Sequence, residues 1–293
     1  MPGMKELALR YRVTDGERFR LTDVDPGDRA GIRSKQKAAA VLARGIERLA
    51  ELQEKLYAQD RWALLVILQA MDAAGKDGTI KHVMSGVNPQ GCEVTSFKAP
   101  STEELDHDFL WRCGLRLPAR GRIGIFNRSY YEEVLVVRVH PELLERQRLP
   151  PELVGAKIWK ERYEDINAFE RRLARNGTRI VKFFLHVSRE EQRRRFMERL
   201  DTEAKHWKFS AADVAEREHW DAYMAAIQEM VRRTSTRDAP WHVVPADHKW
   251  FTHLVVGETI VAALEDLHPA FPNVDKERGK ELKKARAALA AEG

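Results

Sequence analysis

The sequence of 293 residues is 43% hydrophobic and 32% charged, which is enough for one large α/β domain or two smaller ones. It contains no run of about 18 uninterrupted apolar residues, so no membrane-spanning helix is expected, and its N-terminus lacks the apolar core of a secretory signal. The formal net charge of +5 suits a polyanionic partner, but because no nucleic-acid-binding motif is present, the charge alone does not indicate nucleic acid.

The first half of the chain is expected to alternate helices and strands after a polar, turn-rich, extended lead-in over residues 1–33. Over residues 34–59 the apolar residues recur at three- and four-residue steps, which predicts an amphipathic helix. The next expected elements are strand 64–68, a helix from 76, strand 92–98, a helix over 101–113 that begins with the capping box Ser101/Glu104, strand 122–126, and a segment 134–139 that is either extended or helical.

The second half of the chain continues this alternation. Its expected elements are helix 153–174, strand 179–187, an arginine-rich helix that begins with the capping box Ser188/Glu191, strand 241–244, an amphipathic helix 250–267, and a tail from Lys276 that is a solvated helix or a frayed end. Because strands alternate with helices, the sequence predicts an α/β fold with a parallel sheet covered on both faces.

The segment LLVILQAMDAAGKDGTIKHV, residues 64–83, has the layout of a phosphate-binding loop. A buried strand breaks into a loop of small residues, and a helical pattern then begins at Lys76. In this layout the backbone N–H groups of Ala73, Ala74 and Gly75 and the helix N-terminus face an anion, and the lysine adds a positive charge. The alternative is a tight strand-to-helix turn that binds no ligand.

The loop departs from the usual P-loop pattern at two positions. Ala70 stands where the first glycine is expected, which is tolerated if that residue keeps a negative φ. Asp77, followed by Gly78, stands where a Ser or Thr usually helps to hold Mg²⁺. Asp72 and Asp77 are hard oxygen ligands that could replace that hydroxyl.

The segment Phe126–Ser129 (FNRS) follows the next apolar strand. Ligands bind at the carboxyl ends of parallel strands, so this segment is expected to face the phosphate loop. Asn127 supplies a neutral oxygen donor, and Arg128 can form a bidentate contact with phosphate oxygens. The alternative is a turn with a solvated arginine.

The third candidate is an arginine-rich stretch over residues 188–208, placed between a strand and a long helix, where a mobile lid would lie. A lid that brings arginines to a transferring phosphate excludes water and stabilises charge. The alternative is an ordinary solvated helix face, since acidic residues are interspersed. The basic residues are Arg189, Arg193, Arg194, Arg195, Arg199, Lys205 and Lys208.

The chain resembles the polyphosphate kinase 2 family from about Arg33 to Leu267. The segments that carry the resemblance are LQAMDAAGKDGTIKHV, NPQGCEVTSFKAPS, FNRSYYEEVLVVRVH, KFFLHVSREEQRRRFMERL, KHWKFS and APWHVVPADHKW. Ordinary nucleotide kinases share the loop and a lid but not this series. Asn127, where many members carry aspartate, is similar to the subgroup (class III) that accepts both nucleoside mono- and diphosphates.

The resemblance implies a three-layer P-loop kinase-like α/β/α fold: an extension at 1–33, a catalytic domain at 34–270 with a helical lid at about 188–212, and a tail at 271–293. It also implies roles for individual residues. The metal would be held by Asp72 and Asn127, and the acceptor phosphate by Lys76 with Arg128 beside it. The transferring phosphates would be contacted by Arg194, Arg195, Arg199 and Lys208. The remaining phosphate contacts would come from Ala73, Ala74, Gly75, Asp77, Gly78, Lys81 and Lys98.

The expected activity is transfer of a phosphoryl group from inorganic polyphosphate to AMP and ADP, giving ADP and ATP reversibly, with Mg²⁺ (or Mn²⁺) as cofactor. An acceptor phosphate is already anionic near neutral pH, so the site must mainly align two anions and supply positive charge. Two alternatives remain open: an ATP-dependent nucleoside or nucleotide kinase, and a non-catalytic phosphate-binding protein.

The expected setting is the cytoplasm, because Cys92 and Cys113 lack metal-ligand spacing and are most simply reduced, buried thiols. No nucleic acid or membrane partner is expected. The resemblance implies a homo-oligomer, a dimer or tetramer, with the helix at 34–59 as a possible contact.

Overall fold

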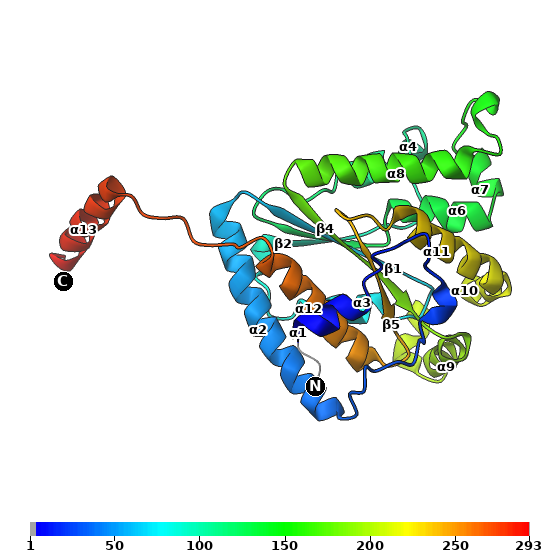
Figure 1. Cartoon of the computed structure of the whole chain (residues 1–293), viewed down its shortest axis with the longest axis horizontal. Helices are drawn as coiled ribbons and strands as arrows, with labels where there is room; N and C mark the ends of the chain where they lie inside the picture. The colour runs from blue at the N-terminus through cyan, green and yellow to red at the C-terminus, as the bar shows by residue number, and fades with distance from the viewer. Residues whose placement is uncertain (1–3, 293) are drawn as a thin grey trace.

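The computed structural model describes residues 4–292, apart from the side chains of Met4, Lys5 and Lys208. Within this range one five-stranded parallel sheet has the strand order β2-β3-β1-β4-β5, and helices cover both of its faces (Figure 1). The strands are β1 (Ala63–Ala70), β2 (Cys92–Ser96), β3 (Ile123–Asn127), β4 (Thr178–His186) and β5 (Trp241–Pro245). The predicted three-layer α/β fold with a central parallel sheet is confirmed.

The helices around the sheet differ widely in length. The longer ones are α1 (Met4–Arg10), α2 (Lys35–Gln59), α3 (Lys76–Val83), α8 (Ile158–Arg175), α9 (Arg189–Leu200), α11 (Trp220–Thr234), α12 (Lys249–Glu265) and α13 (Lys276–Ala290). The short ones are α4 (Thr102–Leu105), α5 (Trp111–Gly114), α6 (Val136–Val139), α7 (Glu142–Glu145) and α10 (Ala211–Ala215). The 3₁₀ segments that matter below are η3 (Tyr130–Val134) and η5 (Glu203–Lys208).

The strand order places the carboxyl ends of β1, β3 and β4 at one edge of the sheet. In the parallel register Leu68 lies opposite Asn127 of β3, and Ala70 lies opposite Leu185 of β4. β1 is the middle strand, and its residues 63–68 are buried because helices cover both faces. The loop that follows β1 therefore lies beside the FNRS segment, as the sequence predicted.

The expected helix over 101–113 is instead two short helices, α4 and α5. The capping box of Ser101 and Glu104 is present at the start of α4. The helix then breaks because the Asp108 carboxylate accepts a hydrogen bond from the Leu110 N–H at 2.9 Å, a local turn that competes with helical pairing. Segment 134–139, for which two conformations were open, is helical at α6.

The expectation that the helix after β5 is amphipathic is wrong. α12 is buried on nearly all sides, because it contacts β4 and β5 on one side, α2 on another, and α1 and α3 at its flanks. A helix enclosed in this way carries apolar residues all round, so its sequence shows little periodicity.

The first 33 residues are not simply an extended lead-in. Residues 4–10 form α1, which packs on α12. The chain then runs antiparallel beside β5, where Arg12 forms a bridge with His242. Backbone hydrogen bonds from Val13 to Trp241 and from Val243 to Tyr11 fix this pairing. The segment thus covers the outer edge of the sheet. The division of the chain into extension, catalytic domain, lid and tail stays a prediction.

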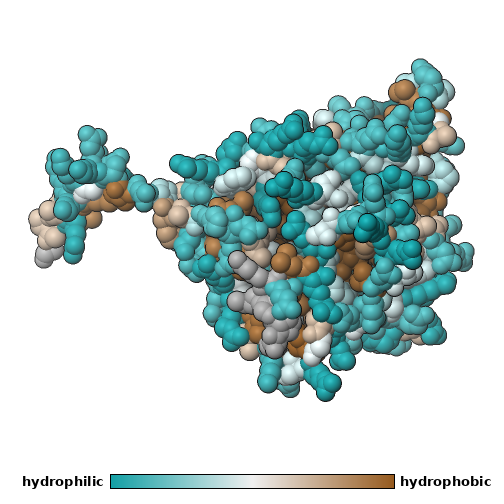
Figure 2. Space-filling view, viewed as in Figure 1, coloured by the Kyte–Doolittle hydropathy of each residue, from teal (hydrophilic) through white to brown (hydrophobic). Residues whose placement is uncertain are grey.

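The C-terminal tail leaves the body of the protein and ends in α13, which extends away from the sheet (Figure 1). The solvated helix that the sequence allowed for this tail is observed, and α13 has no buried residue. Figure 2 shows the tail as largely hydrophilic, with hydrophobic atoms along one side. Leu282 and Leu289 of α13 are exposed. Among the described helices, none combines the length and apolar character needed to cross a bilayer.

A buried ion pair anchors the segment that follows β3. The ammonium of Lys182 on β4 lies 2.7 Å from the Glu170 carboxylate of α8 and donates two further hydrogen bonds, to the Tyr131 hydroxyl and the Thr234 carbonyl. The hydroxyls of Tyr130 and Tyr131 both donate to Glu170 at 2.8 Å. Burial lowers the pKa of Lys182, and the Glu170 carboxylate opposes this effect. The network ties η3, and with it the FNRS segment, to the core.

We expect Lys182→Met to lower the free energy of unfolding by about 3–5 kcal/mol, because it leaves the Glu170 carboxylate buried without its counter-charge. Urea unfolding measures the change. Lys160→Met is the matched control. The side chain of Lys160 is 77% exposed and forms a solvent-exposed ion pair with Glu164, so its loss should change stability little. A loss below about 1 kcal/mol in Lys182→Met would show that the pair does not hold the core.

Candidate functional site

The loop between β1 and α3 has the geometry of an anion-binding turn. Gly75 is the N-cap of α3 with φ 111°, and Ala73 also lies in the left-handed region with φ 61°. An alanine rarely adopts this conformation, which marks a loop held in shape by its surroundings. Ala70 is the last residue of β1, paired with Leu185. Its replacement of the usual glycine therefore leaves the turn intact.

Lys76 reaches back across this loop. Its ammonium donates to the Ala70 carbonyl at 2.8 Å, and its side chain lines the cleft described below. Burial lowers the pKa of Lys76, while the Asp72 carboxylate opposes the shift. The hydroxyl of Thr79, one turn into α3, donates to the Gly75 carbonyl at 3.0 Å. Because this hydroxyl is bonded to the backbone of the loop, it does not replace the metal-binding hydroxyl that the usual motif has after its lysine.

The FNRS segment meets the loop as predicted. Arg128 has φ 65° and donates to the Asp72 carboxylate at 2.9 Å, with Glu132 at 3.6 Å on its other side. The side-chain amide of Asn127 donates to Asp77 at 2.8 Å. Although burial opposes it, the pKa of Arg128 is raised by Glu132 and Asp72. The alternative of a solvated turn arginine is therefore not what the structure shows.

These groups line one cleft of about 940 Å³ between the sheet edge and the arginine-rich helix α9. From the loop and the FNRS segment it takes Asp72, Ala73, Gly75, Lys76, Asp77, Gly78, Asn127 and Arg128. From the strand after α3 and its turn it takes Ser96, Phe97, Lys98 and Ala99. From α9, η5, α10, α3 and α12 it takes Arg195, Glu198, Arg199, Ala204, Lys205, Trp207, Asp213, His82, Lys249 and His253.

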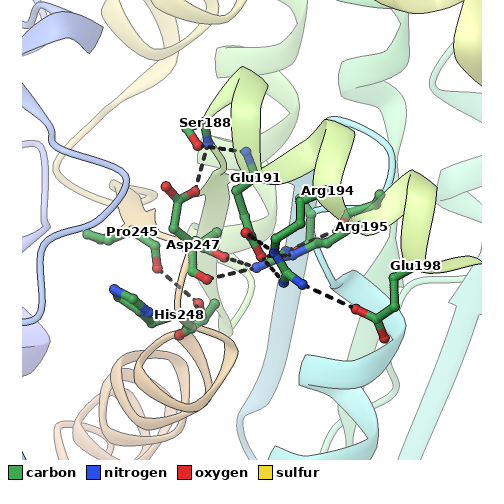
Figure 3. Close-up of polar contacts among 12 residues, drawn as sticks. Ser188, Glu191, Arg194, Arg195, Glu198, Pro245, Asp247 and His248 are labelled. Atoms are coloured by element: carbon green, nitrogen blue, oxygen red, sulfur yellow. Dashed lines mark hydrogen bonds and ion pairs between the residues drawn. The ribbon is translucent and has the colours of Figure 1, made fainter.

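Arg195 joins the arginine-rich helix α9 to the phosphate loop. Its side chain is 3% exposed, and all five of its N–H donors are used, one on the Glu191 carboxylate and four on backbone carbonyls (Figure 3). The carbonyls belong to Ala73 and Ala74 of the phosphate loop and to Ala246 and Asp247 after β5. These contacts hold the loop in place, and the expected contact of Arg195 with a transferring phosphate stays a prediction.

Other predicted site residues divide between the cleft and the surface. Arg199 lines the cleft, 3.9 Å from Asp213. Arg194 is 59% exposed, pairs with Glu191 and Glu198, and lies outside the cleft lining (Figure 3). Lys98 lines the cleft, whereas Lys81 lies on the exposed face of α3 outside it. Ala74, a residue of the phosphate loop, is buried and does not line the cleft. The Lys208 side chain lies outside the described residues.

The start of α9 is capped differently from the expectation. The Ser188 hydroxyl accepts from the Glu191 N–H, as predicted, but the Ser188 N–H donates to the Asp247 carboxylate at 2.8 Å (Figure 3). The Glu191 carboxylate instead pairs with Arg194 and Arg195, which lower its pKa to about 2. Asp247 completes the second half of the cap, so α9 is fixed to the end of β5.

Several cleft residues were not singled out from the sequence. Asp213 lies in α10, and burial together with Asp72 raises its pKa. His82 and His253 line the cleft from α3 and α12. No local sequence motif marks these residues, because the packing of separate helices brings them to the cleft. Lys249, the first residue of α12, also lines the cleft.

The residues present fit a divalent metal shared with bound phosphates. Within residues 4–292, no group of three or more His, Cys, Asp or Glu side chains is placed to hold a metal ion without other ligands. Asp72, Asp77 and Asn127 do line the cleft together. Mg²⁺ is commonly bound by one or two carboxylates plus substrate phosphate oxygens and water, which is the set of ligands this cleft offers.

We expect Arg195→Lys to lower the free energy of unfolding by about 2–4 kcal/mol, because lysine has three donors and leaves buried carbonyls of the loop unpaired. Urea unfolding measures it, and hydrogen exchange of residues 73–75 should accelerate in the variant. Arg194→Lys is the matched control on the exposed side of the same helix and should change stability by less than about 0.5 kcal/mol. Equal effects of the two variants would contradict the assigned role of Arg195.

Comparison with known proteins agrees with this geometry. The family model described as Polyphosphate kinase 2 matches residues 32–272. The chain is 51% identical to the ADP-polyphosphate phosphotransferase of Rhodopseudomonas palustris, over 98% of this chain and 99% of the relative. It is 46% identical to the AMP/ADP-polyphosphate phosphotransferase of Meiothermus ruber, over 90% and 95%.

A solved structure extends the agreement to the fold. The crystal structure of polyphosphate kinase 2 from Arthrobacter aurescens TC1 matches with a TM-score of 0.88 and 43% identity, over 98% of this chain and 97% of that one. The loop, the FNRS segment and the arginine-rich helix are thus set in a fold that solved relatives share. The chain belongs to the polyphosphate kinase 2 family.

Proposed function

We propose that this protein is a phosphotransferase that moves a phosphoryl group from inorganic polyphosphate to AMP and to ADP, forming ADP and ATP. The relatives support the substrates: one is named for ADP and polyphosphate, the other for AMP, ADP and polyphosphate. The observation that carries the proposal is the contact between Arg128 and Asp72, a residue of the phosphate loop. It places a guanidinium, a carboxylate and Lys76 in one cleft.

The mechanism that these residues support is alignment of two anions. The loop N–H groups and Lys76 bind one phosphate, and Arg128 with Arg199 neutralises the charge that spreads over the transferring group. The acceptor oxygen is already anionic near neutral pH, so no strong base is needed. Transfer between two phosphoanhydrides makes and breaks similar bonds, and the direction follows the substrate ratio.

We further propose that Mg²⁺, or Mn²⁺, is held by Asp72 and Asn127 together with phosphate oxygens, with Asp77 beside them. Bound there, the metal would supply positive charge to the phosphate groups. The protein's own groups orient it: Arg128 holds Asp72, and Asp77 accepts from the Asn127 amide. A cytoplasmic location and a homo-oligomeric assembly, a dimer or tetramer, are part of the proposal by analogy with soluble kinases.

We expect Asp72→Ala and Lys76→Ala each to lower kcat by at least about two orders of magnitude, because each removes a charge at the transferring phosphate. The assay measures ADP or ATP formed from polyphosphate and Mg²⁺. Lys160→Ala, on the outer face of α8, controls for loss of an unrelated lysine. Near-normal turnover in both site variants would contradict the mechanism.

We expect Asn127→Asp to weaken the use of AMP relative to ADP. The change replaces the donor that contacts Asp77 at 2.8 Å by a second carboxylate, and the added negative charge repels the acceptor phosphates. The measurement is the ratio of kcat/KM values for AMP and ADP. Asn127→Ala removes the amide without adding charge and should preserve that ratio. An unchanged ratio in Asn127→Asp would discard the idea.

A further inference from the structure

Two histidines face each other at the end of the cleft that lies beside β5. His82 on α3 and His253 on α12 stack with ring centroids 4.5 Å apart and an interplanar angle of 19°. Both line the cleft, together with Lys249 one turn before His253. The ring of His82 contacts the Gly78 carbonyl through Nδ1 at 2.7 Å, so in the neutral form this nitrogen carries the proton and donates.

The topology separates this pair from the FNRS segment. The strand order β2-β3-β1-β4-β5 puts Asn127 on one side of the phosphate loop and α12, which follows β5, on the other. Along α3, His82 lies six residues beyond Lys76, a rise of about 9 Å. A single phosphate bound at the loop does not extend that far along the helix. A chain of phosphates does.

The surroundings of His253 are cationic. Its ring is 8% exposed, and burial lowers its pKa to about 4, with His82, Lys249 and Arg195 acting in the same direction. The free protein therefore holds this imidazole neutral. Lys249 is affected in the same way, since burial and Arg195 lower its pKa.

Charged groups on neighbouring elements include one acidic residue that acts on Lys249. Glu198 of α9 acts on Lys249 and pairs with Lys205 of η5 and with Arg194. The charged contacts between α2 and α12 involve Arg44 with Glu258 and Arg48 with Glu265, both further along α12. α1 also packs on α12, beside its buried Leu7 and Ala8. The charges that act on the His253 imidazole are thus those of the cations Lys249 and Arg195, together with His82.

We propose that His253, stacked on His82, is a proton-linked binding element for the polyphosphate donor: its imidazole is neutral in the free protein and protonated when the polyanion occupies the β5 side of the cleft. This inference rests on the proposed function. A polyanion offsets the repulsion from Lys249 and Arg195, so a proton that is unfavourable in the empty cleft becomes favourable in the occupied one. The nucleotide, in this arrangement, occupies the side with Asn127 and Phe97.

The sign of the pH dependence follows from linkage. In this proposal, occupancy raises the pKa of His253 above its value in the free protein, so the complex binds more protons than the free protein does. The extra affinity is fully present below the free pKa and is lost as the pH rises through the pKa of the complex. One fully linked proton changes Kd by about tenfold per pH unit at most.

The test is calorimetric titration of the full chain with long-chain polyphosphate, with Mg²⁺ and without acceptor nucleotide, in two buffers of different ionisation enthalpy. We expect net proton uptake near neutral pH, up to about one proton per binding event, and a Kd that tightens from about pH 8 to about pH 6. His82→Asn and His253→Asn should each remove most of the uptake and flatten the Kd profile.

Two variants guard against loss of folding. His82 is exposed, so His82→Asn reports even if the buried His253→Asn fails to fold. His268→Asn is the matched control, since His268 follows α12 at its far end with φ 46°, a conformation that asparagine tolerates, and it should behave as the unchanged protein.

Unchanged proton uptake in His82→Asn, or an equal loss of affinity at every pH, would overturn the inference while leaving the proposed function standing. Uptake that accompanies AMP or ADP binding instead, and disappears in His82→Asn, would overturn the assignment to the donor. Failure of the proposed function would show separately, as absence of phosphoryl transfer in the unchanged protein.

Discussion

The five hydrogen bonds of Arg195 are the interaction on which the rest of the site depends. Four of them join α9 to the phosphate loop through Ala73 and Ala74, and to the turn after β5 through Ala246 and Asp247. A loop that contains an alanine in the left-handed conformation needs such support, because the conformation is unfavourable by itself. The arginine-rich helix α9 therefore supports the loop through its buried Arg195. Near its C-terminal end it also places the cation Arg199 in the cleft.

The electrostatics of the cleft follow from the same arrangement. Cations from four elements, Lys76, Arg128, Arg199 and Lys249, surround the carboxylates of Asp72, Asp77 and Asp213. Lys76 and Lys249 both have pKa values lowered by burial, so the cavity holds positive charge at an energetic disadvantage. Polyanionic substrates would relieve that imbalance. Charge stabilisation thus comes from groups that are fixed before any substrate binds.

Much of this fold was predictable because its signals are local. The buried run of β1, the small residues that follow it and Lys76 are adjacent in sequence, and parallel strand ends meet at one edge, which predicted the Asp72–Arg128 neighbourhood. The role of Arg195 was not predictable, because its carbonyl partners lie about 50 and 120 residues away in the chain. The burial of α12 and the stacking of His82 on His253 are likewise set by packing between elements that no single segment reveals.

The central claim is that polyphosphate is the donor and that both AMP and ADP are acceptors. The most direct measurement is nucleotide formation from AMP and, separately, from ADP, with Mg²⁺ and long-chain polyphosphate and no added ATP. The account predicts ADP and then ATP from AMP, and ATP from ADP. Product from ADP alone would contradict the proposed role of Asn127. No product from either nucleotide, in a folded sample, would contradict the proposed function.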